Sequence, residues 1–348
     1  MDVLMKLNVL VILLTSILAS CTQIGSTIIR TDRNHYGVEV AKSERSQLLL
    51  NIVRLRYLDS IEFLQINSIT AQKTRQNSGT AALTVPYMHS DINAFGSTFS
   101  FTDAPTVSFT PLQGASFVSS LLTPISFQSI AYLTGTHWDL SKIFLLSIDR
   151  INDYHNAVGF IARIGKAKAL NYTSFRKVVN YIHILQTAQA IDLEANLVNK
   201  KEEQLVIFFN HKREVDTELK LKRLLNISPK ADFMIFSPHY STSTKNNIVS
   251  VKTRSIVGVL SYLANAVVIP EDSTFQGTIP HIPDVTIHSS ASPVSSTINT
   301  YYRGYYYYIS ENDESSKRSF LMLSDFVELT AGLPGGNNGV VLTLPVGK

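Results

Sequence analysis

The chain has 348 residues, of which 45% are hydrophobic and 17% charged, with a formal net charge of +4. This composition excludes a disordered chain and supplies enough apolar residues for a substantial core. The small and scattered positive excess gives no basis for nucleic-acid binding. Cys21 is the only cysteine, so no disulfide can form within one chain and stability must come from packing.

Residues 1–20 have the features of a secretory signal peptide. The apolar run 7–19 follows Lys6 and is too short to cross a membrane, which needs about 20 residues. Asp2 weakens the positive charge expected at the start of such a signal. Initiation at Met1 and at Met5 therefore both remain open.

The signal ends in a pattern that predicts lipid attachment. Leu18, Ala19 and Ser20 precede Cys21, and a lipoprotein signal peptidase needs this order of one aliphatic and two small residues. We predict that Cys21 carries a diacylglyceryl thioether and an N-acyl chain, such as palmitate. Several chains anchor durably, because each buried methylene contributes ~0.8 kcal/mol. Thr22 follows the cysteine in place of an aspartate, which by resemblance to Gram-negative lipoproteins implies retention in the outer membrane. The alternative is an ordinary secretory signal with a chance cysteine after its cleavage site.

The first part of the mature chain is expected to be a lipidated tether at 21–33 and an α+β region at 34–168. The hydrophobic periodicity predicts a helix and then a strand, followed by a polar loop with short strands at 73–104. Further short elements complete the region. The predicted elements are helix Ser43–Tyr57, strand Glu62–Gln72, strand Pro105–Pro111, helix Ala115–Leu122, helix Gln128–Thr134 and a buried strand Lys142–Asp149.

Arg56 falls inside the apolar arc of the first predicted helix. A buried guanidinium must be paired, because an unpaired one costs several kcal/mol. Asp59 and Glu62 are the nearest carboxylates, so we expect one of them to pair with Arg56 in a structural role. Alternatively, Arg56 extends along its own aliphatic stem to the surface.

The second part, 169–348, is also expected to be α+β, with a long surface loop at 271–300. The near balance of charges over 200–223 predicts a solvated face. The predicted elements are helix Ser174–Ala190, strand Leu205–Phe209, helix Val215–Leu225, strands Asp232–Phe236 and Ile248–Lys252, helix Arg254–Val267, strand Tyr301–Ile309, helix Ser319–Thr330 and strand Val340–Leu344. The whole pattern favours an α+β fold of mixed or antiparallel sheets with packed amphipathic helices, as one large or two intimately packed domains.

The strand predicted over 301–309 is dense in tyrosine. Its alternation places rings on both faces of the strand. One face is then core and the other an exposed aromatic surface of the kind enriched in protein interfaces, unless both faces are buried. The interaction candidates are Tyr301, Tyr302, Tyr305, Tyr306, Tyr307 and Tyr308.

Motifs for catalysis are missing from the sequence. It contains no Gly-x-Ser-x-Gly elbow, phosphate-binding loop, His-Glu-x-x-His zinc helix or dinucleotide fingerprint. His281, Asp284 and His288 share the predicted 271–300 loop, where such histidines are more typical of surface residues than of a metal site. His183 lies at the edge of its helix. We therefore expect no enzymatic activity, no metal and no cofactor.

Several segments resemble a widespread, poorly characterised family of bacterial outer-membrane lipoproteins. They are QLLLNIVRLRY with FLQINSITAQ, PTVSFTPLQG, TRSIVGVLSYLANAVVIP, SSKRSFLMLSDFVELTAG and VVLTLPV. One departure is Leu58, which stands between the Arg-Tyr pair and Asp59 where the family often continues directly with Gly, Asn or Asp. The chain is also similar to accessory outer-membrane lipoproteins of Dot/Icm-like type IVB secretion systems.

The sequence and the resemblance together predict a non-enzymatic lipoprotein, anchored in the outer membrane through Cys21 and facing the periplasm. Its expected partners are envelope proteins, including lipoproteins of a secretion complex, and not nucleic acid. An alternative is a periplasmic hydrolase or ligand-binding lipoprotein with an unrecognised site, which a deep pocket with converging polar groups would support.

Overall fold

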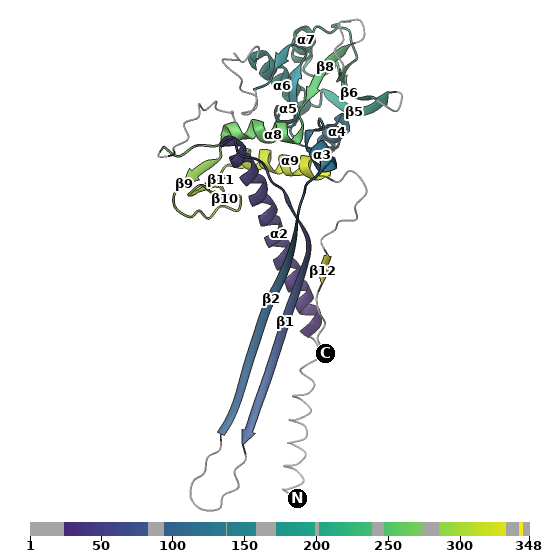
Figure 1. The fold of residues 1–348 in the computed structure, drawn as a ribbon. Coiled ribbons are helices and arrows are strands. Elements are labelled where there is room, and N and C mark those ends of the chain that lie inside the picture. Colours follow the sequence, from purple (N-terminus) through teal and green to yellow (C-terminus); the bar gives the residue numbers. More distant parts are fainter. Residues whose placement is uncertain are drawn as a thin grey trace, which may run out of the picture.

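The computed structural model describes residues 24–82, 94–136, 138–157, 172–198, 202–238, 247–271, 273, 285–331 and 341–343. Figure 1 shows a body of packed helices and sheets, from which one long helix and one long β-ribbon extend in the same direction. We call this ribbon the arm. It consists of strands β1 (Leu64–Ala82) and β2 (Ala94–Pro111).

The longest of the described helices is α2, near the N-terminal end of the chain. They are α2 (Ile24–Arg56), α3 (Ala115–Leu122), α4 (Phe127–Gly135), α5 (Leu140–Ser147), α6 (Tyr172–Thr187), α7 (Val215–Leu224), α8 (Ile256–Leu263), the 3-10 helix η3 (Ala264–Ala266) and α9 (Glu314–Ala331). None of these helices is both long and apolar enough to cross a membrane.

The remaining described strands are β3 (Ile148–Ile151), β4 (Tyr154–His155), β5 (Ile191–Val198), β6 (Glu202–Phe209), β7 (Phe233–Ser237), β8 (Ile248–Thr253), β9 (His288–Ser290), β10 (Asn299–Tyr302), β11 (Tyr305–Tyr308) and β12 (Val341–Thr343). They form three sheets together with the arm, in the orders β4-β3-β8-β7-β6-β5, β10-β11-β9 and β12-β1-β2. Most neighbours are antiparallel, but β7 pairs with β8 and β1 with β12 in parallel. The predicted α+β class with mixed sheets is therefore confirmed.

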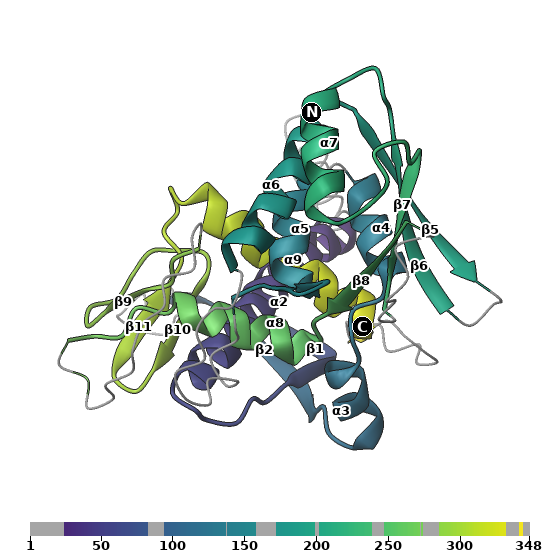
Figure 2. The same cartoon turned by 90° about the horizontal axis from the view of Figure 1, so that it is seen from above.

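The six-stranded sheet is the main layer of the body. Its inward positions are apolar and fully buried, among them Leu205, Ile207, Met234 and Phe236. Figure 2 shows helices α4, α5 and α6 on one side of this sheet. The stripe that the sequence predicts for α6 is confirmed, since Phe175, Val178, Val179, Ile182 and Leu185 are all buried.

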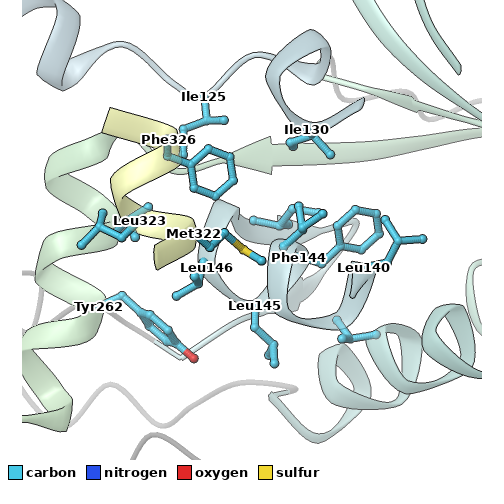
Figure 3. Packing of buried hydrophobic residues seen from close by; sticks show 14 of the residues in the cluster. Ile125, Ile130, Leu140, Phe144, Leu145, Leu146, Tyr262, Met322, Leu323 and Phe326 are labelled. Atoms are coloured by element: carbon cyan, nitrogen blue, oxygen red, sulfur yellow. The ribbon is translucent and has the colours of Figure 1, made fainter. Parts of the chain in front are cut away.

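A second packing layer joins elements from distant parts of the chain. Met322, Leu323 and Phe326 of α9 lie against Leu146 of α5 and Tyr262 of α8 (Figure 3). Helix α5 contacts both strand β3 of the six-stranded sheet and α9, and α8 contacts α5 and α9. The two halves predicted from the sequence share this core.

Polar residues at helix starts explain several boundaries. The side chains of Ser126, Asp139 and Ser255 accept hydrogen bonds from backbone N–H groups of Ser129, Ser141 and Gly258, at the starts of α4, α5 and α8. Such caps satisfy donors that the first helical turn leaves without partners.

The prediction of a buried strand over 142–149 is wrong, because most of it belongs to helix α5. The run is apolar on every side, and periodicity alone does not separate a buried helix from a buried strand. The cap at Asp139 and full burial among α4, α6 and α9 favour the helix. Only Ile148 and Asp149 of the predicted strand are extended, in β3.

The prediction of a loop over 73–104 is also wrong, because β1 and β2 continue as an antiparallel pair through most of it. Helix α2 begins at Ile24, so the segment predicted as a tether and the polar residues after it are helical from there onward. Within 271–300 the structure places β9 and the start of β10, which the absence of any periodicity concealed.

Candidate interaction surfaces

The six tyrosines lie on a β-hairpin and not on one strand. Arg303 and Gly304 form the turn between β10 and β11, with φ angles of 48° and 90°. Two consecutive residues with positive φ are the requirement of a type I′ hairpin turn, and glycine adopts this conformation without strain. The pair Arg-Gly between tyrosines was the signal in the sequence for this hairpin. We refer to β9, β10 and β11 as the tyrosine sheet.

One face of the tyrosine sheet is buried against the body. The register places Thr300 opposite Tyr307 and Tyr302 opposite Tyr305, so these four residues share a face. Thr300 and Tyr307 are almost completely buried, whereas Tyr302 and Tyr305 are partly exposed. Burial raises the pKa of the Tyr307 hydroxyl, and its hydrogen bond with Tyr57 raises this pKa further. This face anchors the sheet.

The anchoring partner is the C-terminal end of α2. The hydroxyl oxygens of Tyr57 and Tyr307 are 2.6 Å apart and share a hydrogen bond. Asp59 accepts hydrogen bonds from the Tyr302 hydroxyl and from Nη2 of Arg303, the latter at 2.8 Å. The Arg303 guanidinium also lies over the Tyr57 ring, 5.0 Å from its centre. Residues that are about 245 positions apart thus lock the long helix to the tyrosine sheet.

The outward face of the tyrosine sheet is aromatic and partly open to solvent. The side chain of Tyr301 is 59% exposed and its ring lies 4.9 Å from that of Tyr306. His288 stacks on Tyr308 at 5.4 Å with an angle of 30° between the rings. Offset rings of this kind form a flat surface suited to protein contacts. The alternation of buried and exposed positions agrees with the sequence prediction, although two strands carry it.

Of the two alternatives expected for Arg56, burial is the one that the structure shows. Its side chain is fully buried, so it does not extend to the surface. The ion pairs that the structure gives to the two nearest carboxylates go to other arginines, Asp59 to Arg303 at 2.8 Å and Glu62 to Arg54 at 2.9 Å.

Glu62 has a structural role through its backbone. The side-chain amide of Asn51 donates to the carbonyl oxygen of Glu62 at 2.8 Å and its oxygen accepts from the Glu62 N–H at 3.0 Å. Asn51 is itself fully buried in α2. This pair of bonds fixes the chain between the helix and β1, and therefore fixes where the arm starts.

A buried charged network lies on α7, where the sequence predicted a solvated face. The ammonium of Lys222 donates to Glu218 at 2.5 Å and to the carbonyl oxygens of Pro229 and Ala231 at 3.2 Å and 2.6 Å. Both side chains are nearly inaccessible to solvent. The i,i+4 spacing was visible in the sequence, but the loop that covers the pair was not.

His211 extends this network to the surface. Its Nδ1 lies 2.7 Å from Glu218 and its Nε2 lies 3.0 Å from Asp232. With a carboxylate at each nitrogen, both nitrogens donate only when the ring is protonated. The hydrogen bonds to Asp232 and then Glu218 accordingly raise the pKa of His211. This arrangement stabilises a charged histidine beside the buried ion pair.

The other histidines do not form a site among the described residues. His183 Nδ1 lies 3.0 Å from Asp139, which is also the cap of α5, and His288 stacks in the tyrosine sheet. His281 and Asp284 lie outside the residues that the structure describes. No group of three His, Cys, Asp or Glu side chains within the described ranges is arranged to hold a metal ion.

The predicted lipid site also lies outside the described residues, together with the cleavage motif Leu18, Ala19 and Ser20. Cys21 precedes the first residue of α2 by only three positions. Three residues span at most about 10 Å. The covalent chain therefore keeps any lipid on this cysteine close to the first described residue of α2.

No protein-family model matches the chain, and neither a curated protein nor a solved structure shows significant similarity to it.

Proposed function

We propose that this chain is a non-enzymatic lipoprotein, anchored in the outer membrane through Cys21, that acts by protein contacts in a periplasmic envelope assembly. The outer-membrane core of a Dot/Icm-like type IVB secretion system is an assembly of this type. The resemblance of several segments to outer-membrane lipoproteins supports the location. The shape of the molecule supports the role.

The observation that carries the proposal is the length and attachment of α2. Its 33 residues span about 50 Å, with the anchor at one end and the body at the other. The bonds from Tyr57 and Asp59 to the tyrosine sheet fix the helix to the body. A rigid spacer that starts at the membrane would hold the body at a set depth in the periplasm, which suits a component of a layered assembly.

The anchor is tested with a Cys21→Ser variant of the full chain. Membranes are separated by density, and the wild type is expected in the outer-membrane fraction with the variant released into the soluble periplasm. Thr22→Ser leaves the cleavage motif intact and serves as the matched control. If Cys21→Ser stays with the outer membrane to the same extent as the control, the lipid anchor is excluded.

The assembly is tested by purifying the tagged, lipidated protein from detergent-solubilised envelope. We expect co-purifying proteins in stoichiometric amounts, and a loss of them on Tyr301→Ala. Tyr132→Ala is the matched control, because Tyr132 on α4 is 58% exposed against 59% for Tyr301. Recovery of the protein alone, from envelope that retains its other complexes, would contradict the proposal.

A further inference from the structure

The arm and α2 extend away from the body in the same direction (Figure 1). The side-chain amide of Gln47 donates to the carbonyl oxygen of Leu64 at 3.2 Å, so β1 begins beside the helix and before the C-terminal end of α2. In Figure 2, seen from above, neither the arm nor α2 extends beyond the outline of the body. Both elements therefore point to the same side of the molecule.

The arm reaches farther from the body than α2 does. From Gln47 back to Ile24, its first described residue, the helix covers about 35 Å. From Leu64 to Ala82, strand β1 covers about 60 Å. Figure 1 accordingly shows the described end of the arm farther from the body than the start of α2.

The predicted lipid site lies no farther from the body than the end of the arm. Cys21 precedes Ile24 by three positions, so it is at most about 10 Å from the start of the helix. Measured from the contact between Gln47 and Leu64, the arm is about 25 Å longer than this part of the helix. A bilayer that holds a lipid on Cys21 is therefore within reach of the arm, even though the two elements diverge.

The composition of the arm changes at one level along its length. Lys73 and Asp103 are directly opposed in the register, and Arg75 is the last charged residue of β1. Beyond this level, residues 76–82 and 94–102 include no Asp, Glu, Lys, Arg or His. Charged side chains become less favourable with depth in a bilayer, so an uncharged end is the part of the arm that can approach lipid at low cost.

The number of strands limits how deep such a contact can be. Among the described strands, only β1 and β2 reach this end of the arm. The backbone N–H and C=O groups at the outer edges of two strands would lack hydrogen-bond partners in hydrocarbon. Headgroups and water supply such partners. The contact that fits the arm is therefore with the headgroup region of a bilayer.

We propose that the end of the arm, where Ala82 pairs with Ala94, rests among the headgroups of the membrane that holds the lipid of Cys21. The inference rests on the proposed function, because it takes the lipid anchor as given and adds a second, non-covalent contact with the same bilayer. A single anchor point lets the body turn about its attachment. Two points of contact fix which side of the body faces the membrane and which faces the periplasm.

Quenching of a fluorescent dye by lipid tests this contact. The full-length, lipidated protein is reconstituted in phosphatidylcholine vesicles that contain phospholipids with a nitroxide near the headgroup. The dye is attached through Ala94→Cys, Thr106→Cys or Ser295→Cys, and the chain without an added cysteine shows that lipid blocks the thiol of Cys21. Thr106 lies on β2 about 40 Å nearer the body, and Ser295 is an exposed residue of the body.

We expect the dye at Ala94 to lose fluorescence in the nitroxide vesicles and the dyes at Thr106 and Ser295 to keep theirs. Quenching at Ala94 that does not exceed quenching at Thr106 would overturn the proposal. A blue shift of the Ala94 dye without quenching by lipid would also overturn it. That result would show contact with protein, either a second copy or the same chain.

A charge placed at the end of the arm gives a second measurement. The Cys21→Ser variant lacks the lipid, so its co-sedimentation with uncharged phosphatidylcholine vesicles reports the arm contact alone. Adding Ala82→Asp is expected to lower the bound fraction about threefold, because a charged side chain is disfavoured at the boundary of the hydrocarbon. Thr106→Asp is the matched control on the same arm. Equal effects of the two substitutions, or no binding of Cys21→Ser at any lipid concentration, would contradict the proposal.

The results separate this inference from the proposed function. The arm contact alone is weak, so Cys21→Ser is still expected to leave the outer membrane during fractionation. If it does so but the dye at Ala94 is not quenched, the lipid anchor stands and the arm contact fails. If the dye is quenched but Cys21→Ser stays in the outer-membrane fraction, the lipid anchor fails and the arm contact stands.

Discussion

The body and the arm both contain β-sheet, but the side chains of the two sheets are covered to different extents. In the body, helices cover the six-stranded sheet, and inward residues such as Ile207 and Phe236 are fully buried. In the arm, Val107 and Phe109 remain 40% and 52% exposed, and beyond Thr70 only two strands are described. The body can therefore form its core from this chain alone. The described part of the arm leaves apolar side chains of β2 near the body partly exposed to solvent.

The largest expected contrast is between two phenylalanines. Phe144 is fully buried and its ring lies 5.9 Å from that of Phe236, so Phe144→Ala should lower the free energy of unfolding by about 3–5 kcal/mol. Phe109→Ala on the arm should change it by less than about 0.5 kcal/mol. Urea unfolding of the purified full chain in detergent, followed by near-UV circular dichroism, measures both. A similar loss for the two variants would remove the distinction between body and arm.

Removing only one partner of the buried ion pair on α7 should lower the free energy of unfolding about as much as Phe144→Ala. Lys222→Met leaves the Glu218 carboxylate buried beside His211 alone, which is expected to destabilise the body by about 3–5 kcal/mol. Adding Glu218→Leu removes the stranded charge and should recover most of the loss. The same unfolding measurement applies to both variants. If the double variant is no more stable than Lys222→Met, burial of the carboxylate is not the cause.

The contact between α2 and the tyrosine sheet should have an intermediate effect. Tyr57→Phe leaves the buried Tyr307 hydroxyl without this hydrogen-bond partner, at a cost of about 1–2 kcal/mol. Tyr301→Phe, which removes a hydroxyl from the exposed face, should be within about 0.5 kcal/mol of wild type. Thermal unfolding compares the two. An unchanged Tyr57→Phe would mean that the hydroxyl pair does not hold the helix to the body.

The smallest effect concerns pH. The pKa of His211 is raised in the folded chain by Asp232 and Glu218, with Lys222 opposing, so its stabilisation is fully present below the ordinary pKa of 6.5. It is lost as the pH rises through the higher folded value. Stability of the wild type should therefore decline modestly as the pH rises above 6.5. His211→Gln should flatten this decline, and an unaltered slope in that variant would exclude His211 as its source.

Sequence reasoning succeeded where the signal was local and periodic. The stripe of α6 from Phe175 to Leu185 gave the helix and its buried face, and the bounds of α3 were predicted as found. It failed for α5, where an apolar run has no period. It also failed for the tyrosines, because a single strand was predicted where Arg303 and Gly304 form a turn between two strands.

Longer-range errors had a different cause. The partners of Asp59 come from β10 and its turn, and the cover over Lys222 comes from Pro229 and Ala231. The spacing of residues in the sequence does not predict such contacts. The arm was missed because its outer part has few large apolar residues on β1, so only β2 carries a strong alternation.

What the sequence determined by itself is the α+β class, the periodic helices and a cysteine pattern that predicts where a lipid would be attached. What only the tertiary structure decided is which charges are buried, which tyrosines face outward, and that β1 and β2 extend as one arm beside α2. The physical reason is that hydrophobic periodicity shows which face of a segment is buried. Strand pairing and the burial of charged side chains depend instead on which distant segment packs against that face.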